Sequence, residues 1–265
     1  MIHTVLTLSA LLAVPSGPSS LAVPVPLQED ESIVDGRPEI KELLGDLKGH
    51  VKRKAKEDEE AKGVIDKLLQ EWEHSGPKDR KEIVKGLDAC FKAKRPKELE
   101  PGVPDDRLYY AAATALGRMG PESVKPLTKL LGHKSHRKNL RLQQRVALSL
   151  GMTKDEDAIK PLLDLLKDDQ PEMQAAGADA LGNYDKLALK ERKKIFEEVL
   201  KIMTGQKAQV DQDPTNQEAD QRWRMISGPM NATLRRLSGH EESSPEAWRS
   251  WWNDNKKADW DAEGE

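Results

Sequence analysis

The clearest charged patch in this chain of 265 residues lies between His133 and Arg145, a segment with five Lys or Arg residues and no acid. In a helix, Lys138, Arg141 and Arg145 would share one face, because side chains three and four residues apart are neighbours. Such a patch can grip a phosphate, a sulfate or an acidic protein segment through charge-assisted hydrogen bonds. The alternative is a solvated face offset by nearby acids, since residues 154–172 carry seven acids against three lysines.

Other residues capable of chemistry are better explained as structural. His133 and His136 lie across a predicted turn, with no nearby acid or thiol to complete a metal site. Cys90, the single thiol, is expected to be a small buried apolar group. The pairs Asp105–Asp106 and Asp168–Asp169 precede predicted helices, where carboxylates satisfy free N–H groups. Since common nucleotide-binding and hydrolase motifs are also missing from the sequence, we predict no catalytic residue, no metal site and no cofactor.

Five of the six tryptophans lie beyond residue 220, and Trp248, Trp251 and Trp252 share one helical face. Large aromatic rings cover the exposed apolar stripe of a terminal repeat with few residues, so the cluster is interpreted as a cap. Tryptophans also stack on sugars or anchor a protein partner. Trp251 and Trp252 are therefore candidate partner-binding residues as well.

The composition favours helices as the elements that position these groups. Charged residues make up 34% and aromatic residues 4% of the chain, and runs of β-branched residues of strand length do not occur. The net charge is −3, so no overall field draws the chain to nucleic acid or to an anionic membrane.

A repeated pattern gives the organisation of these helices. Leu-Gly pairs end at Gly117, Gly151 and Gly182, which are 34 and 31 residues apart, within the range of helical arrays. Lys-Pro-Leu follows the first pair at 125–127 and the second at 160–162.

Each copy is predicted to be a pair of antiparallel helices. An apolar stripe precedes Gly117; Gly117 and Gly120 loosen the end of that helix, and Pro121 begins the next. Neither helix buries its stripe alone, but stacked pairs share one core. We therefore predict an all-α fold, an α-solenoid of stacked antiparallel helix pairs.

The copies resemble HEAT repeats, especially the short variety first described in phycobilisome bilin lyases, most clearly over residues 105–205. The resemblance implies a solenoid that presents a surface to another protein, and hence a non-catalytic interaction scaffold. An alternative is a ligand-binding protein or an enzyme like the bilin lyases, which would need a bilin and a nucleophile. A third is a protein that binds nucleic-acid backbones through Lys and Arg.

The first 22 residues are interpreted as a secretory signal peptide. Val5–Val14 is a short apolar core, and Ser20-Leu21-Ala22 supplies small residues for cleavage after Ala22. The apolar run is about half of the ~20 residues that cross a bilayer as a helix, so no membrane span is predicted in the mature chain. Residues 245–252 resemble the ends of some exported bacterial HEAT proteins. We expect a periplasmic or secreted protein.

The flanks of the repeats are predicted as follows. Residues 23–56 form a polar, charged N-terminal segment, and residues 57–104 form a degenerate first helix pair and a linker. The charge switch from Lys52-Arg53-Lys54 to Glu57-Asp58-Glu59-Glu60 is typical of a solvated helix, which we expect to be loosely attached. Residues 206–221 form a polar loop, interpreted as an inert linker or as a contact surface. Residues 222–256 form Trp-rich capping helices, and residues 257–265 form a tail.

Overall fold

The structure, a computed structural model, describes residues 33–95 and 105–262. These residues form a helical fold in which the one β-type contact is an isolated bridge between Val34 and Ser75. The α-helices are α1 (Pro38–Val51), α2 (Asp58–Gln70), α3 (Pro77–Cys90), α4 (Arg107–Arg118), α5 (Val124–Leu130), α6 (Leu140–Met152), α7 (Ile159–Leu165), α8 (Pro171–Leu181), α9 (Leu189–Gln212), α10 (Gln217–Ser238) and α11 (Pro245–Asn255). Short 3₁₀ turns are η1 (Gly120–Ser123), η2 (Glu156–Ala158) and η3 (Gly182–Tyr184).

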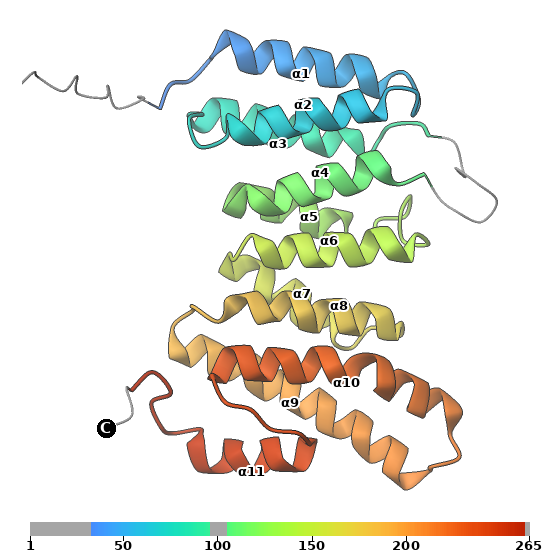
Figure 1. Ribbon diagram of the computed structural model, residues 1–265, viewed down its shortest axis with the longest axis vertical. Helices are drawn as coiled ribbons and strands as arrows, with labels where there is room; N and C mark the ends of the chain where they lie inside the picture. Colours follow the sequence, from blue (N-terminus) through green and yellow to red (C-terminus); the bar gives the residue numbers. More distant parts are fainter. Residues whose placement is uncertain (1–32, 96–104, 263–265) are drawn as a thin grey trace, which may run out of the picture. The chain divides into compact units, whose positions relative to one another are not determined.

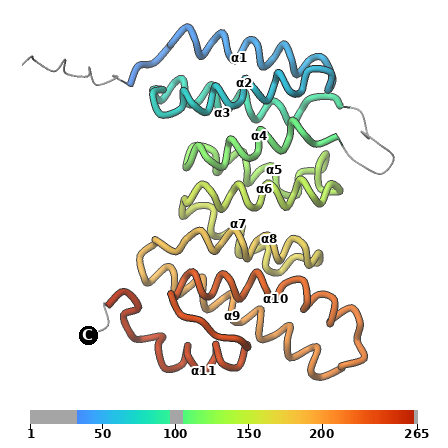
Figure 2. The backbone as a smooth tube through the Cα atoms, in the orientation of Figure 1, coloured from blue at the N-terminus to red at the C-terminus, as the bar shows by residue number. Residues whose placement is uncertain are grey.

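Helices α2 to α10 stack in two layers (Figures 1 and 2). Helices α2, α4, α6, α8 and α10 form the first layer, and each packs on the next. Helices α3, α5, α7 and α9 lie behind them, and each of the first three contacts the first-layer helix of the following pair. This interlocking of successive pairs confirms the predicted α-solenoid.

Leucines at equivalent repeat positions fill the seam between the layers. Leu116, Leu150 and Leu181 are fully buried, and so are Leu127 and Leu162 of the second-layer helices. Burying one such side chain contributes about 1.5–3 kcal/mol relative to leaving it exposed. The apolar stripes that define the repeat therefore form one continuous core.

The glycine of each Leu-Gly pair allows close helix packing. A Cβ on Gly117 would lie 2.6 Å from the carbonyl oxygen of Ser149, and one on Gly151 would lie 2.6 Å from that of Ala180. Helix α4 ends at Arg118, one residue after Gly117 and close to its predicted end. Gly120, at φ +78°, is the left-handed residue after the helix.

Three predicted segments differ from the structure: the loop at 206–221, the N-terminal helix and the C-terminal tail. The polar loop at 206–221 is mostly helix, because α9 extends to Gln212 and α10 begins at Gln217. Gln, Lys and Ala in this stretch are good helix formers, and α9 and α10 pack on each other as a hairpin. Only residues 213–216 connect the two helices, and Asn216 caps α10 by accepting a hydrogen bond from the Ala219 N–H.

The prediction of a loosely attached helix over residues 52–60 was wrong, because residues 52–57 form a turn and the helices on either side of it, α1 and α2, are packed. Helix α1 buries Ile40 and Leu47 against α2 and α3. The Asp79 carboxylate also accepts hydrogen bonds from the backbone N–H groups of Gly36 and Arg37, both at 3.0 Å. The predicted signal peptide at 1–22 and most of the linker before Asp105 lie outside the described residues.

Residues 257–262, predicted only as a tail, fold back onto α9. The Trp260 ring packs on Phe196 with ring centroids 5.3 Å apart, and the Asp261 carboxylate pairs with the buried guanidinium of Arg192. The Lys193 ammonium lies over the Trp260 ring, 5.1 Å from its centre. This part of the tail therefore belongs to the end of the core.

Candidate binding groove

Two hollows lie over the first-layer helices. One, of about 420 Å³, lies mainly over α2 and α4; the other, of about 320 Å³, lies over α4, α6 and α8. Tyr110 and Arg145 line both hollows, which we therefore treat as one surface, the Tyr110 groove. Its other charged lining residues are Lys62, Asp66, Arg107, Arg118, Arg141 and Asp179.

Equivalent positions of successive repeats build this groove. Counting back ten residues from the glycines Gly117 and Gly151 gives Arg107 and Arg141, and counting back seven gives Tyr110 and Gln144. All four of these residues line the groove. They lie side by side because first-layer helices stack in register, so the repeat itself produces a ladder of polar side chains.

Two of the three predicted basic residues meet in the groove. Arg141 and Arg145 lie one turn apart on α6, and the Arg145 guanidinium is 5.8 Å from the centre of the Tyr110 ring. Neither arginine has an ion-pair partner within 4.0 Å in the described part of the chain. Lys138 was wrongly placed on their helical face, because it precedes the N-cap Asn139 and does not line the groove.

The electrostatics of the groove favour an anionic ligand. Five Lys or Arg side chains line it against two acids, Asp66 and Asp179. Burial raises the pKa of Asp179, while the nearby Arg236 lowers it. Burial, assisted by Asp106, also raises the pKa of the Tyr110 phenol. The phenol thus stays protonated at neutral pH and can donate a hydrogen bond.

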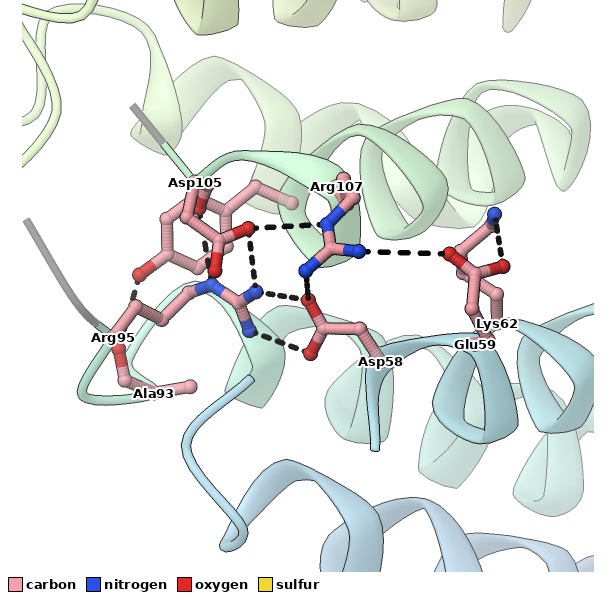
Figure 3. Close-up of polar contacts among 8 residues, drawn as sticks. Asp58, Glu59, Lys62, Ala93, Arg95, Asp105 and Arg107 are labelled. Carbon is pink, nitrogen blue, oxygen red and sulfur yellow. Dashed lines mark hydrogen bonds and ion pairs between the residues drawn. The ribbon is translucent and has the colours of Figure 1, made fainter. Parts of the chain in front are cut away.

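A buried ionic cluster fixes one end of the groove (Figure 3). The Arg95 guanidinium donates to both carboxylate oxygens of Asp58, with Nη1 2.9 Å from Oδ1, and lies 3.1 Å from Asp105 Oδ1. The side chains of these three residues are at most 3% exposed. Burial opposes the charged form of Arg95, but its hydrogen bonds to the two carboxylates outweigh burial and raise its pKa.

Arg107 links the ionic cluster to the groove. Its Nε lies 3.4 Å from Asp105 Oδ1 and its Nη1 lies 4.0 Å from Glu59 Oε1, while Glu59 also accepts a hydrogen bond of 2.7 Å from Lys62 (Figure 3). The acids thus hold Arg107 and Lys62 in place and offset part of their charge. The two arginines on α6, like Arg118 on α4, have no acid within 4.0 Å among the described residues.

This cluster corrects two predictions from sequence. Asp105 and Asp106 were expected to cap α4, but Asp105 pairs with Arg95, and Asp106 accepts a hydrogen bond of 2.7 Å from Asn139 instead of capping. Asp58 was assigned to a solvated charge run and is instead buried. Local sequence could not indicate these roles, because the partners are 10 to 37 residues apart.

A family model for HEAT repeats matches residues 96–182, the part of the chain that includes α4 to α8. The chain is a HEAT-repeat protein. No curated protein matches it. Within residues 33–95 and 105–262, this HEAT-repeat protein has no helix with the length and apolar character required to cross a membrane.

The thiol of the HEAT-repeat protein and one of the two histidines considered for a metal site, His136, are part of its packing. Cys90 is 1% exposed, as predicted, and burial raises the pKa of its thiol to about 12. His136 hydrogen-bonds to the backbone carbonyl of Phe91 through Nε2 at 2.9 Å and stacks edge-on to Tyr109. Among the described residues, no three His, Cys, Asp or Glu side chains gather in a way that could hold a metal ion.

Trp251 and Trp252, the other candidate partner-binding residues, lie at the C-terminal end. Both are half-buried, and their rings lie 5.6 and 5.2 Å from the ring of Phe196. Trp248, on the same helix, is fully buried. These contacts fit a terminal cap, and partner binding by Trp251 and Trp252 stays a prediction.

Proposed function

We propose that this HEAT-repeat protein is a non-catalytic scaffold that binds another protein by docking an acidic segment in the Tyr110 groove. The observation that carries the proposal is the arrangement of Arg141 and Arg145 beside Tyr110, without ion-pair partners among the described residues, in a groove where cations outnumber acids. Arg and Tyr are the side chains on which binding energy at protein interfaces is concentrated. Paired arginines also bind carboxylates with two parallel hydrogen bonds each.

A peptide titration tests this function. A fluorescent peptide of Glu and Asp interspersed with Gly and Ser should bind the full chain, and its affinity should fall as salt is raised. The double variant Arg141→Gln/Arg145→Gln should weaken binding at least tenfold. The matched control Lys134→Gln/Lys138→Gln removes the same charge from the same segment outside the groove, and it should bind like the wild type.

Other results of the titration would overturn the proposal. An equal loss in both double variants would mean that only overall charge matters. Single-stranded DNA that binds as tightly as the peptide, with the same dependence on Arg141 and Arg145, would instead identify a nucleic-acid backbone binder. A separate experiment identifies the natural partner. A photo-crosslinking amino acid in place of Tyr110 would capture that partner covalently.

We further propose that the protein is exported after removal of residues 1–22. The basis is the sequence alone, an apolar core followed by small residues at Ala22. Expression in a bacterium followed by fractionation should place the chain in the periplasm or the medium. N-terminal sequencing should then begin at Val23, and a cytoplasmic chain that retains Met1 would refute export.

A further inference from the structure

Another hollow, of about 410 Å³, lies between α1 and α3, away from the Tyr110 groove. We call it the α1–α3 cleft. Its volume is within the range of small-molecule sites. It contributes nothing to the proposed docking of a protein segment, so its function is a separate question.

The floor of the α1–α3 cleft is apolar. Leu47 and Cys90 are buried there, and Leu44 and Val51 are half-buried beside them. Gly86 shapes the floor, because a Cβ at this position would lie 2.5 Å from Leu44 Cδ2. The floor therefore offers a surface for hydrocarbon, and its one ionisable group is a buried thiol.

The rim of the cleft is positively charged. Lys48 and Lys52 lie one turn apart at the C-terminal end of α1, and neither has an ion-pair partner within 4.0 Å among the residues described. The one acid on the rim, Glu82, lies 3.4 Å from Lys85 and is already paired. A ligand with an anionic head at Lys48 and Lys52 would complement this charge.

We propose that the α1–α3 cleft binds single-chain aliphatic carboxylates. The carboxylate lies between Lys48 and Lys52, and the hydrocarbon chain lies on Leu44, Leu47 and Val51. Both halves of the site are needed: the floor alone would accept any alkyl chain, and the lysines alone would accept any small anion. The combination selects an amphiphile with a negative head.

Calorimetric titration of the full chain with dodecanoate, below the concentration at which it aggregates, tests this proposal. Saturable binding of one molecule per chain is expected. Decanoate and octanoate should bind more weakly, by up to about fourfold for each methylene removed. Dodecyltrimethylammonium has the same chain with the opposite charge and should bind at least tenfold more weakly. Equal affinity for the two dodecyl compounds would overturn the proposal.

Variants of the cleft locate the site. Lys48→Gln/Lys52→Gln should weaken dodecanoate binding about tenfold, whereas Lys41→Gln/Lys56→Gln, with the same charge change outside the cleft, should not. Ala89→Trp fills the cleft from a position of α3 that lines it and should abolish binding while circular dichroism shows a folded chain. A folded Ala89→Trp variant with wild-type affinity would rule out this cleft.

Cys90 provides an independent readout because it is the only thiol in the chain and lies on the floor of the cleft. Saturating dodecanoate should slow its labelling by maleimide at least tenfold, and the Ala89→Trp variant should show no such effect. Vesicles of phosphatidylglycerol test the other source of such chains. If the protein binds to the vesicles but does not bind dodecanoate, the α1–α3 cleft is a membrane contact and not a small-molecule site.

Discussion

Gly117 of α4 and Ser149 of α6 meet so closely that a Cβ on the glycine would lie 2.6 Å from the serine carbonyl oxygen. The contact joins two successive repeats through backbone atoms, which cannot move aside as a flexible side chain can. The same contact recurs between Gly151 and Ala180. Close approach of the first-layer helices thus depends on glycine at this repeat position.

Gly117→Ala should therefore destabilise the protein by about 1–3 kcal/mol, since overpacking outweighs the better helix propensity of alanine. Gly205→Ala is the matched control, because Gly205 lies in α9 and a Cβ at this position would have no neighbouring atom within 4 Å. That variant should gain up to about 1 kcal/mol. Urea unfolding measures the free energy of unfolding of both variants. A Gly117→Ala protein as stable as the control would show that α4 and α6 can move apart without cost.

Asp58→Ala should cost roughly 3–5 kcal/mol, because it leaves the buried Arg95 guanidinium with less compensation for its charge. The neighbouring Glu59 is the control: it is an acid in the same helical turn, but its side chain is 65% exposed. Glu59→Ala should change the free energy of unfolding much less. Similar losses in the two variants would mean that Asp58 acts only through the helix dipole.

Leu162→Ala should cost roughly 2–5 kcal/mol, because this fully buried leucine of α7 would leave a cavity in the seam between repeats. Met152→Ala, at a position 36% exposed, should stay within about 0.5 kcal/mol of the wild type. Thermal and urea unfolding give both values. A loss for Leu162→Ala as small as that of the control would contradict its place in the core.

Trp260→Ala should destabilise the C-terminal end by about 1–3 kcal/mol, since the half-buried ring packs on Phe196 and hydrogen-bonds to the Asn255 carbonyl at 3.0 Å. Lys257→Ala changes an exposed residue of the same tail and should have little effect. Hydrogen exchange of α11 should quicken in the tryptophan variant alone. Unchanged exchange would mean that residues 257–262 are dispensable to the fold.

Alkaline pH should weaken the fold through Cys90. Burial raises the pKa of this thiol from 9.0 to about 12, so the unfolded chain loses the proton first. The contribution of the protonated Cys90 thiol to the free energy of unfolding is complete below pH 9 and is lost as the pH rises towards 12. Stability measured between about pH 8 and 10.5 should fall less steeply in Cys90→Ala than in the wild type. Parallel curves would show that the thiol does not contribute.

The sequence by itself determined the helix pairs, their register and the residues of the seam, because local periodicity and the Leu-Gly spacing specify which faces must be buried. The residues that line the groove also occupy equivalent positions of successive repeats in the sequence: Arg107 and Arg141 share one position, and Tyr110 and Gln144 share another. Tyr110 was not predicted as a binding residue, because the apolar stripe of each repeat was read separately and equivalent positions of different repeats were not compared.

Only the tertiary structure decided which charges are buried and which stay free for a ligand. Asp58 and Arg95 form an ion pair across 37 residues, whereas Arg141 and Arg145, in the segment predicted as a charged patch, keep no acid partner among the described residues. Local sequence shows the number of charges but not their neighbours in space. Packing of α9 on α10 likewise made helix of residues that looked like a polar loop. In both cases contacts between segments distant in the sequence outweigh the preference of the local sequence. These contacts determine which side chains are removed from water and which charged groups are paired.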